Sequence, residues 1–349
     1  MEGRVKMIRS TPKFASVCAA TAAPPPAAPP PPRSAPEPPR TRTVVRVIPA
    51  ARPVIVEKAA PCADGYRADV PSQLLRRWNL LMALFHLSLG AATLALGNLD
   101  LSVATFTLQN RLEYRTPNGT WTAIRPDGAV DTERTWRLWP TPELDGEILF
   151  TLATASFFLI SALFHAGNGL LWRRFYEEQL RQCRSPTRWA EYTITAPLMF
   201  ALIAYGMGLR SRAELVATAA LVSATIPYGA WGEDAARPKS ALEWCQPLWR
   251  RALPWALGHI PQTVAWVLVI LKYQDLDGKA PWFVDVILWS QFVLFYSFGG
   301  AVLVGLLLGP RSFWKQELGF QVLSLVSKGL LGALLLSNVL MLERFDDIY

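Results

Sequence analysis

Lys328 lies inside the last long apolar segment of the chain, FQVLSLVSKGLLGALLLSNVLML, and no acidic residue occurs between Glu317 and Glu343. A charged ammonium group at the centre of a membrane-spanning helix costs roughly 3 kcal/mol on the insertion scale. Ionisable residues at such depth are therefore rare, and they either pair with another group or carry function. Lys328 needs an acidic partner, or a covalent role such as a Schiff base.

Glu191, in RWAEYTITAPLM, is the acidic residue that best fits as this partner. Glu191, Thr195 and Met199 recur every four residues, so they share one helix face. Ser324 lies one helical turn before Lys328 and places a hydroxyl beside it. Two hypotheses stay open: a structural ion pair between two helices, or a Schiff base on Lys328 whose proton Glu191 stabilises as counterion.

The depths of the two residues do not match if the helices begin where the apolar segments begin. At 1.5 Å per residue, Lys328 is about 15 Å into its segment and Glu191 only about 3 Å into its own. We therefore expect the helix of Glu191 to begin before Trp189, with the Arg188 side chain extending toward the membrane surface.

Two histidines, His86 in NLLMALFHLSLG and His165 in FLISALFHAGNG, also lie in apolar segments. His165 shares a helix face with Ser161 and Asn168, which predicts a polar stripe directed into the bundle. The two imidazoles are candidates for handling a proton near Lys328, and hydrogen-bonded packing is the alternative. No His or Cys pattern has metal-ligand spacing, and no motif of a soluble enzyme occurs, so we expect neither a metal site nor an enzyme.

Composition predicts the scaffold that positions these residues. Hydrophobic residues make up 51% of the 349, and seven segments with few charges are long enough to span a bilayer. The predicted fold is an all-α membrane protein, a seven-transmembrane-helix bundle. The segments run over Trp78–Gly97, Ile148–Trp172, Trp189–Leu209, Leu215–Gly232, Ala252–Tyr273, Phe283–Leu308 and Leu318–Leu342.

The distribution of Lys and Arg predicts how this bundle is oriented. The side shared with the N-terminus carries thirteen basic residues close to the segment ends, whereas the opposite side carries five, with five more diluted through one long loop. Because positive charge favours the cytoplasmic side, we expect a cytoplasmic N-terminus and an exterior C-terminus. The thirteen are Arg76, Arg77, Arg173, Arg174, Arg181, Arg184, Arg188, Arg237, Lys239, Arg250, Arg251, Arg311 and Lys315.

The long loop after the first segment predicts a small exterior β-hairpin. Apolar and polar residues alternate around a PNG turn, which favours strands over Val103–Tyr114 and Thr120–Ile124. Asn118 also begins an Asn-Gly-Thr sequon, a glycosylation candidate if the loop meets the secretory lumen.

Residues 1–75 differ from the rest of the chain in composition. The segment AAPPPAAPPPPRSAPEPPR and the scarcity of large apolar residues predict a disordered cytoplasmic tail. The first 25 residues are basic and rich in Ser, Thr and Ala, so a transit peptide is an alternative to an ordinary tail. We expect the helical domain over 76–343 and an exterior tail over 344–349.

Four motifs resemble those of the heliorhodopsins in order and spacing. They are RWNLLMALFHLSLG, LFHAGNG, RWAEYTITAPLM and LSLVSKGLL, and the resemblance covers about Arg77–Leu342. It implies all-trans retinal bound as a Schiff base on Lys328, with Glu191 as counterion, Ser324 nearby and the two histidines as proton-handling candidates. It also implies an N-terminus inside and a homodimer. The segments IPYGAWGED and HIPQTVAW fit the family only loosely. The resemblance therefore does not indicate which residues form the wall of the retinal pocket on their side.

Three functions follow from these observations. The leading hypothesis is a light-sensing retinal protein that signals to a cytoplasmic or membrane partner, embedded in lipid and without a nucleic-acid partner. The second is a light-gated proton channel that uses the same chromophore. The third is a transporter or scaffold without a chromophore, in which Lys328 and Glu191 form a structural ion pair.

Overall fold

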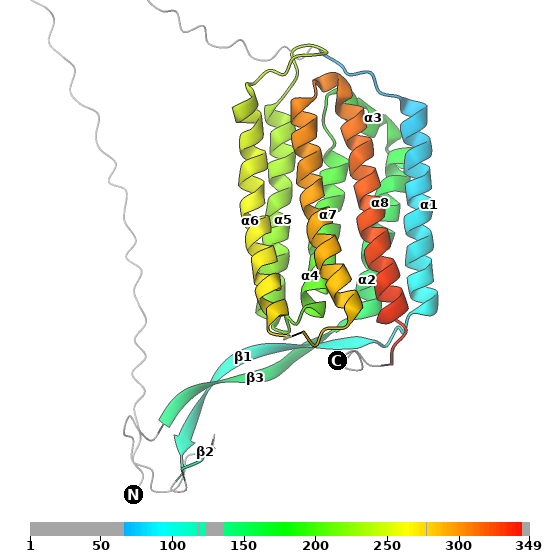
Figure 1. The fold of residues 1–349 in the computed structure, drawn as a ribbon. Coiled ribbons are helices and arrows are strands. Elements are labelled where there is room, and N and C mark those ends of the chain that lie inside the picture. Colours follow the sequence, from blue (N-terminus) through cyan, green and yellow to red (C-terminus); the bar gives the residue numbers. More distant parts are fainter. Residues whose placement is uncertain (1–65, 117–118, 123–135, 277, 344–349) are drawn as a thin grey trace, which may run out of the picture. The chain divides into compact units, whose positions relative to one another are not determined.

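The computed structural model describes residues 66–116, 119–122, 136–276 and 278–343. Within these ranges seven long helices lie side by side as a bundle, with the short helix α3 (Arg173–Arg181) at one end and a β-sheet at the other (Figure 1). The long helices are α1 (Ser72–Leu96), α2 (Phe150–Ala166), α4 (Pro186–Gly206), α5 (Arg212–Ala235), α6 (Leu248–Gln274), α7 (Trp282–Leu307) and α8 (Phe313–Asn338). This arrangement confirms the predicted seven-helix bundle.

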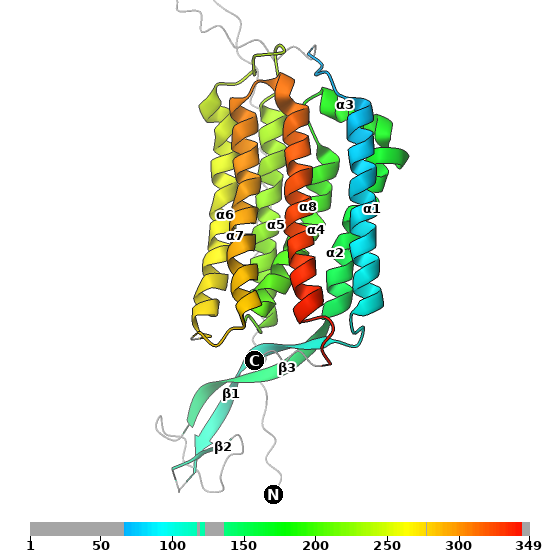
Figure 2. The ribbon, with the colours of Figure 1, turned by 45° about the vertical axis from the view of Figure 1, so that its right-hand side comes forward.

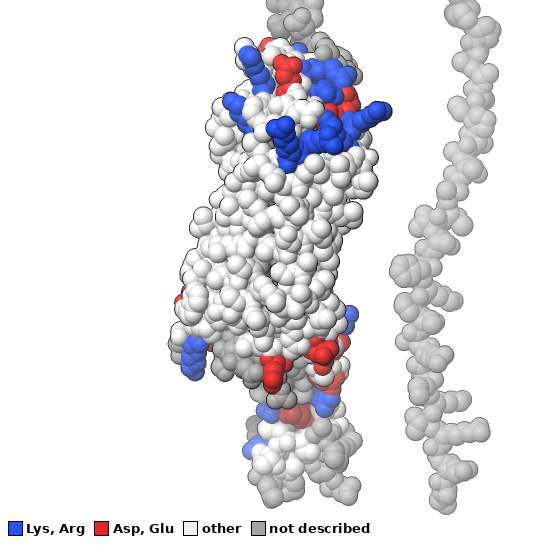
Figure 3. Space-filling model, turned by 90° about the vertical axis from the view of Figure 1, so that its right-hand side faces the viewer, with Lys and Arg blue, Asp and Glu red and all other residues white. Residues whose placement is uncertain are grey.

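Six of these helices, α1, α2, α5, α6, α7 and α8, are each long and apolar enough to cross a membrane. The remaining one, α4, is 21 residues long and carries buried Arg188 and Glu191 in its first two turns, which lower its hydropathy. The face of the bundle shown in Figure 3 carries a band without Lys, Arg, Asp or Glu between two charged ends. The bundle is therefore that of an integral multi-pass membrane protein.

The chain enters the bundle earlier than the sequence predicted. Helix α1 begins at Ser72, six residues before Trp78, and Ala68 and Leu75 are buried against Tyr176 and Leu180 of α3. Residues 66–75 therefore belong to the packed structure and not to the tail that was expected to reach residue 75. Apolar contacts with α3 explain the difference. The hydropathy of residues 66–75 alone does not show that another helix will pack against them.

The long loop between α1 and α2 forms a three-stranded antiparallel sheet in the order β2-β1-β3. Strand β1 (Ser102–Arg115) matches the prediction closely, and β2 (Trp121–Thr122) is the short remainder of the predicted second strand within the described residues. Gly119 has the expected positive φ of +83° at the turn. Asn118 and residues 123–135 lie outside the described residues, so the glycosylation prediction is not addressed.

The main partner of β1 is β3 (Trp136–Leu149), which the sequence analysis did not predict. Its sequence, WRLWPTPELDGEIL, contains Pro140 and Pro142, residues that argue against a central strand. Both prolines are tolerated because β3 lies at the edge of the sheet. The strand also extends through Ile148 and Leu149, which were expected to begin the second membrane helix.

Helices α2 and α8 approach closely at Gly332, beside the turn that carries Lys328. A Cβ atom at Gly332 would lie 2.3 Å from the ring of Phe158, a buried side chain of α2. Glycine at this position therefore lets the lysine-bearing helix pack directly against α2.

Candidate functional site

Lys328 lies at a three-helix contact inside the bundle. Its Nζ atom donates hydrogen bonds to Oε1 of Glu191 on α4, at 2.6 Å, and to Oγ of Ser161 on α2, at 2.5 Å. All three residues are at most 3% exposed. The ammonium group and its carboxylate are thus paired in a site that excludes bulk water, where their attraction is strong.

The depth mismatch between Lys328 and Glu191 is resolved partly as expected. Helix α4 begins at Pro186, three residues before Trp189, as expected, whereas α8 begins at Phe313, five residues before Leu318, which by itself would enlarge the offset. Long helical side chains also lean toward the helix N-terminus, so Lys328 reaches back along α8 toward Glu191. The two helices run in the same direction (Figure 1), so this reach and the early start of α4 together bring the ammonium group to the carboxylate.

The prediction that Arg188 extends to the membrane surface is wrong. Its side chain is only 4% exposed and forms ion pairs with Glu317 of α8 and Glu233 of α5. Glu233 also accepts hydrogen bonds from the Trp189 indole, at 2.9 Å, and from the Ser185 backbone amide, at 2.8 Å. Two carboxylates stabilise the buried guanidinium, and the sequence alone did not place them beside it.

Replacing Arg188 with methionine should destabilise the protein by roughly 3–5 kcal/mol, because two buried carboxylates would lose their shared cation. Thermal unfolding of the detergent-solubilised protein, followed by tryptophan fluorescence, measures the loss. Arg181→Met is the control, because its ion pairs with Glu177 and Glu178 are only partly buried and 3.7 Å long. Equal losses in the two variants would contradict the assignment of a buried charge cluster.

The two predicted histidines lie against each other near this ion pair. The rings of His86 on α1 and His165 on α2 stack with centroids 5.5 Å apart and planes 12° apart. Both are buried, and among the described residues His165 Nε2 and both ring nitrogens of His86 have no hydrogen-bond partner. The structure thus brings the histidines together but shows no hydrogen bond from either to Lys328.

A chain of hydrogen bonds leads from His165 to the buried charge cluster. His165 Nδ1 donates to Asn79 Oδ1 at 3.0 Å, and the Asn79 amide reaches the Tyr176 hydroxyl at 3.5 Å. Tyr176 donates to Glu317 Oε1 at 3.0 Å. Burial on α3 raises the pKa of the Tyr176 phenol well above its ordinary value, so the hydroxyl keeps its proton. The sequence analysis missed Asn79 and Tyr176, although Asn79 is a polar residue within an apolar segment.

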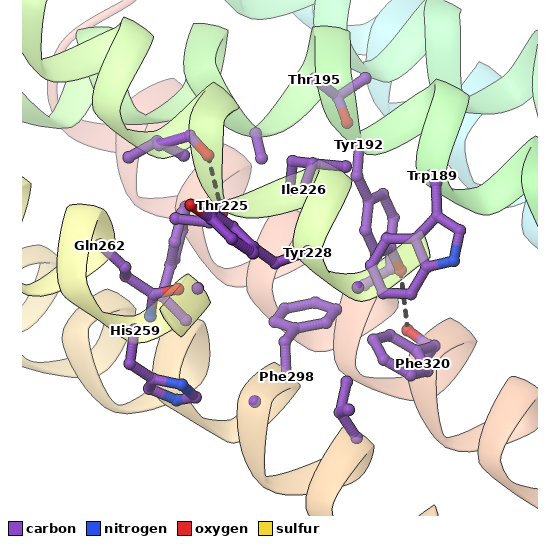
Figure 4. Close-up of a pocket in the computed structure, with 18 of the residues that line it drawn as sticks. Trp189, Tyr192, Thr195, Thr225, Ile226, Tyr228, His259, Gln262, Phe298 and Phe320 are labelled. Atoms are coloured by element: carbon purple, nitrogen blue, oxygen red, sulfur yellow. Dashed lines mark hydrogen bonds between the residues drawn. The ribbon is translucent and has the colours of Figure 1, made fainter. Parts of the chain in front are cut away.

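A cavity opens beside Lys328 and runs between five helices. It encloses about 850 Å³ of space free of protein atoms, part of it open to the exterior, and its lining is mostly apolar. Figure 4 shows the aromatic side chains of Trp189, Tyr192, Phe298 and Phe320 along one part of it. A mostly apolar lining with a few polar groups is typical of a small-molecule site.

Four of the five predicted chromophore-binding residues line this cavity, and the fifth, Glu191, lies behind its wall as the partner of Lys328. Thr195 and Met199 come from α4, and Ser324 and Lys328 from α8. Among the described residues, the hydroxyl oxygens of Thr195 and Ser324 are buried without a hydrogen-bond partner. A long apolar molecule attached to a lysine fits this donor set, since Lys328 is the one buried lysine of the described residues and stands at the cavity wall.

Sequence reasoning missed the opposite wall of the cavity, which α5 and α6 supply. Of the aromatic residues of α6 and α7, Trp255, Phe295 and Phe298 line the cavity, whereas Trp266, Trp289, Phe292 and Tyr296 do not. Helical spacing gave no means of choosing between them, because interface belts and cores use the same residue types. The residues missed here are Thr225, Ile226, Tyr228, Gly258, His259 and Gln262.

Comparison with known proteins adds one match. A model of the Heliorhodopsin family matches residues 75–340, which include all seven long helices almost entirely. No curated protein matches the chain. The matched family implies a seven-helix bundle with a retinal chromophore and a light response, and it is not a classical enzyme family. The chain belongs to the heliorhodopsin family.

Proposed function

We propose that this membrane protein is a light sensor in which all-trans retinal is bound through a Schiff base to Lys328. The observation that carries the proposal is the position of Lys328, buried at the wall of an apolar cavity with Glu191 at 2.6 Å. A purely structural ion pair would not require a cavity beside the lysine. Retinal, when bound, supplies light absorption and photoisomerisation.

Glu191 is the counterion in this proposal. Its carboxylate lies within hydrogen-bond distance of Lys328 Nζ, and burial strengthens the interaction with a positive charge on that nitrogen. Ser161 accepts a second hydrogen bond from the same nitrogen and holds it in place. The Glu191 carboxylate and the Ser161 hydroxyl therefore determine the direction of the N–H bonds of Lys328.

The histidine pair is the proposed transient site for a proton that leaves this nitrogen. Ser161 and His165 are four residues apart on α2 and therefore share one helix face. This face connects the ion pair, through Ser161, with the stacked histidine rings. A change in protonation of His165 would alter its hydrogen bond to Asn79, and through Tyr176 the charge cluster at Arg188. The protein thereby converts a local change of charge into a change at the end of the bundle that carries α3.

That end of the bundle is the proposed cytoplasmic face. Lys and Arg side chains gather there in Figure 3, as the positive-inside rule requires for a cytoplasmic surface. The N-terminus is then inside and the C-terminus outside. A cytoplasmic or membrane signalling partner would bind at this face, and a homodimer is the assembly that the family resemblance suggests.

A light-gated proton channel is the second candidate, favoured by the hydrogen-bond chain from His165 to Glu317. Glu147, an acidic residue just before α2, lies on β3 and is exposed, outside the helical bundle. Among the described residues, hydrogen-bonded polar groups thus lead from the site toward the end of the bundle that carries α3. Glu147 does not extend this path toward the end that carries the sheet. This asymmetry favours a sensor over a channel.

Adding all-trans retinal to the purified apoprotein should produce a visible absorption band, and illumination should not produce photocurrent in voltage-clamped cells that express the protein. The band tests for a chromophore, and the current separates sensor from channel. Absence of a band with correctly folded protein would favour the transporter or scaffold hypothesis. A photocurrent that follows the proton gradient would favour the channel.

A further inference from the structure

The cavity wall farthest from Lys328 carries polar groups that a hydrocarbon ring would leave unused. Helix α8 carries the lysine, whereas α6 lies across the bundle from it, beyond α5 and α7, in both ribbon views (Figures 1 and 2). Tyr228 of α5 and His259 and Gln262 of α6 line the cavity there, and Figure 4 shows them on the side away from Trp189 and Phe320. An elongated molecule attached to Lys328 would direct its far end toward this wall.

Gln262 is the first of these groups. Its Nε2 atom is buried and has no hydrogen-bond partner among the described residues. An amide N–H that is buried without an acceptor costs free energy, and such groups in native proteins usually bond to water or to a ligand. Gln262 therefore offers a hydrogen-bond donor to whatever fills this end of the cavity.

His259 supplies an acceptor on the same helix face, three residues before Gln262. Its Nδ1 atom lies 2.8 Å from the backbone carbonyl oxygen of Trp255. Because a carbonyl oxygen only accepts, Nδ1 carries the hydrogen of the neutral imidazole and Nε2 is left as an acceptor. The ring is held against Trp255, with centroids 4.6 Å apart, and against Tyr296, at 5.9 Å.

A donor and an acceptor on one face match a hydroxyl group, which accepts one hydrogen bond and donates another. The ring of retinal contains only carbon and hydrogen, so it satisfies neither group. We infer that the cavity selects a ring-hydroxylated retinal, whose hydroxyl oxygen accepts from Gln262 Nε2 and whose hydroxyl hydrogen is donated to His259 Nε2. This inference rests on the proposed function and names the class of chromophore.

Competition between two chromophores tests the inference directly. The full-length apoprotein is incubated with an equimolar mixture of all-trans retinal and all-trans 3-hydroxyretinal, and the bound chromophores are extracted as oximes and quantified by chromatography. The wild-type protein should bind the hydroxylated form roughly five- to tenfold in preference, the ratio expected for one satisfied buried hydrogen bond. Gln262→Leu should lower this ratio toward one without loss of the visible band, since only the hydrogen bond to His259 would remain.

Thr263→Val is the matched control, because Thr263 neighbours Gln262 but is exposed and bonds to the Tyr296 hydroxyl. It should keep the wild-type ratio. His259→Phe should lower the ratio as Gln262→Leu does. Agreement between the two variants would show that the change does not come from misfolding of one of them. A wild-type ratio of one or less, with a visible band present, would overturn the inference but leave the proposed function standing. No visible band with either compound would instead overturn the proposed function.

Discussion

Replacing Lys328 with alanine should abolish the visible absorption band that all-trans retinal produces with the wild-type protein. Only Lys328 among the described lysines is buried at the cavity wall, so no other amine stands where the Schiff base is proposed to form. Absorbance between the near-ultraviolet and the red, recorded after incubation with retinal, is the measurement. The expected effect is complete loss of the band, and a retained band would remove Lys328 from the role.

Loss of fold must be separated from loss of the attachment site. Lys328→Ala leaves Glu191 buried without its cation, which costs roughly 3–5 kcal/mol when one partner of such a pair is removed. The double variant Lys328→Ala with Glu191→Gln removes the unpaired charge and should regain much of the thermal stability. It should still form no visible band, because stability is restored but the amine is not.

Replacing Glu191 with glutamine should make the Schiff base lose its proton at a lower pH than in the wild-type protein. A negative carboxylate 2.6 Å from the nitrogen favours the protonated form, so it raises this pKa, and a neutral amide removes that effect. Deprotonation, seen as loss of the visible band, should therefore occur at lower pH in the variant. A spectrophotometric pH titration of both proteins measures the difference.

Glu214→Gln serves as the control for this titration, because Glu214 is an exposed residue in the first turn of α5. It should titrate like the wild-type protein. If Glu191→Gln also left both the spectrum and the titration unchanged, another group would have to be the counterion. Ser161 alone could not replace it, since a neutral hydroxyl does not balance a positive charge.

The sequence was sufficient to predict which helices meet at the site because buried charge is expensive. Lys328 and Glu191 stand out in apolar segments, and the cost of leaving either one unpaired predicts their contact. The same reasoning was incomplete for Arg188. Its partners Glu233 and Glu317 lie on two other helices, and which polar residues at helix ends converge depends on tertiary packing that the sequence pattern does not contain.

The wall formed by α5 and α6 could not be predicted for a different reason. His259 and Gln262 follow the 3.6-residue period of any helix, and that period does not distinguish a side chain facing a cavity from one facing lipid or a neighbouring helix. Pro261 adds to the ambiguity, because a proline within a helix marks an irregularity without giving its direction. Only the packed bundle shows that the residues converge on the space beside Lys328.

Strand β3 illustrates how local propensity is overridden by pairing. The segment Trp136–Leu149 contains two prolines, yet thirteen register pairs join it to β1. Its partner strand was predicted because alternation and the PNG turn are local signals. The pairing of β3 is a long-range contact, and local signals do not specify it.

The central claim, that Lys328 is the attachment site of retinal, is tested most directly by reductive trapping. Sodium borohydride converts the linkage to a stable secondary amine, and proteolysis followed by mass spectrometry locates the added retinyl group. The account predicts this mass increment on the peptide that contains Lys328 and on no other lysine-containing peptide. An increment on a different lysine, or a visible band without any trapped adduct, would contradict it.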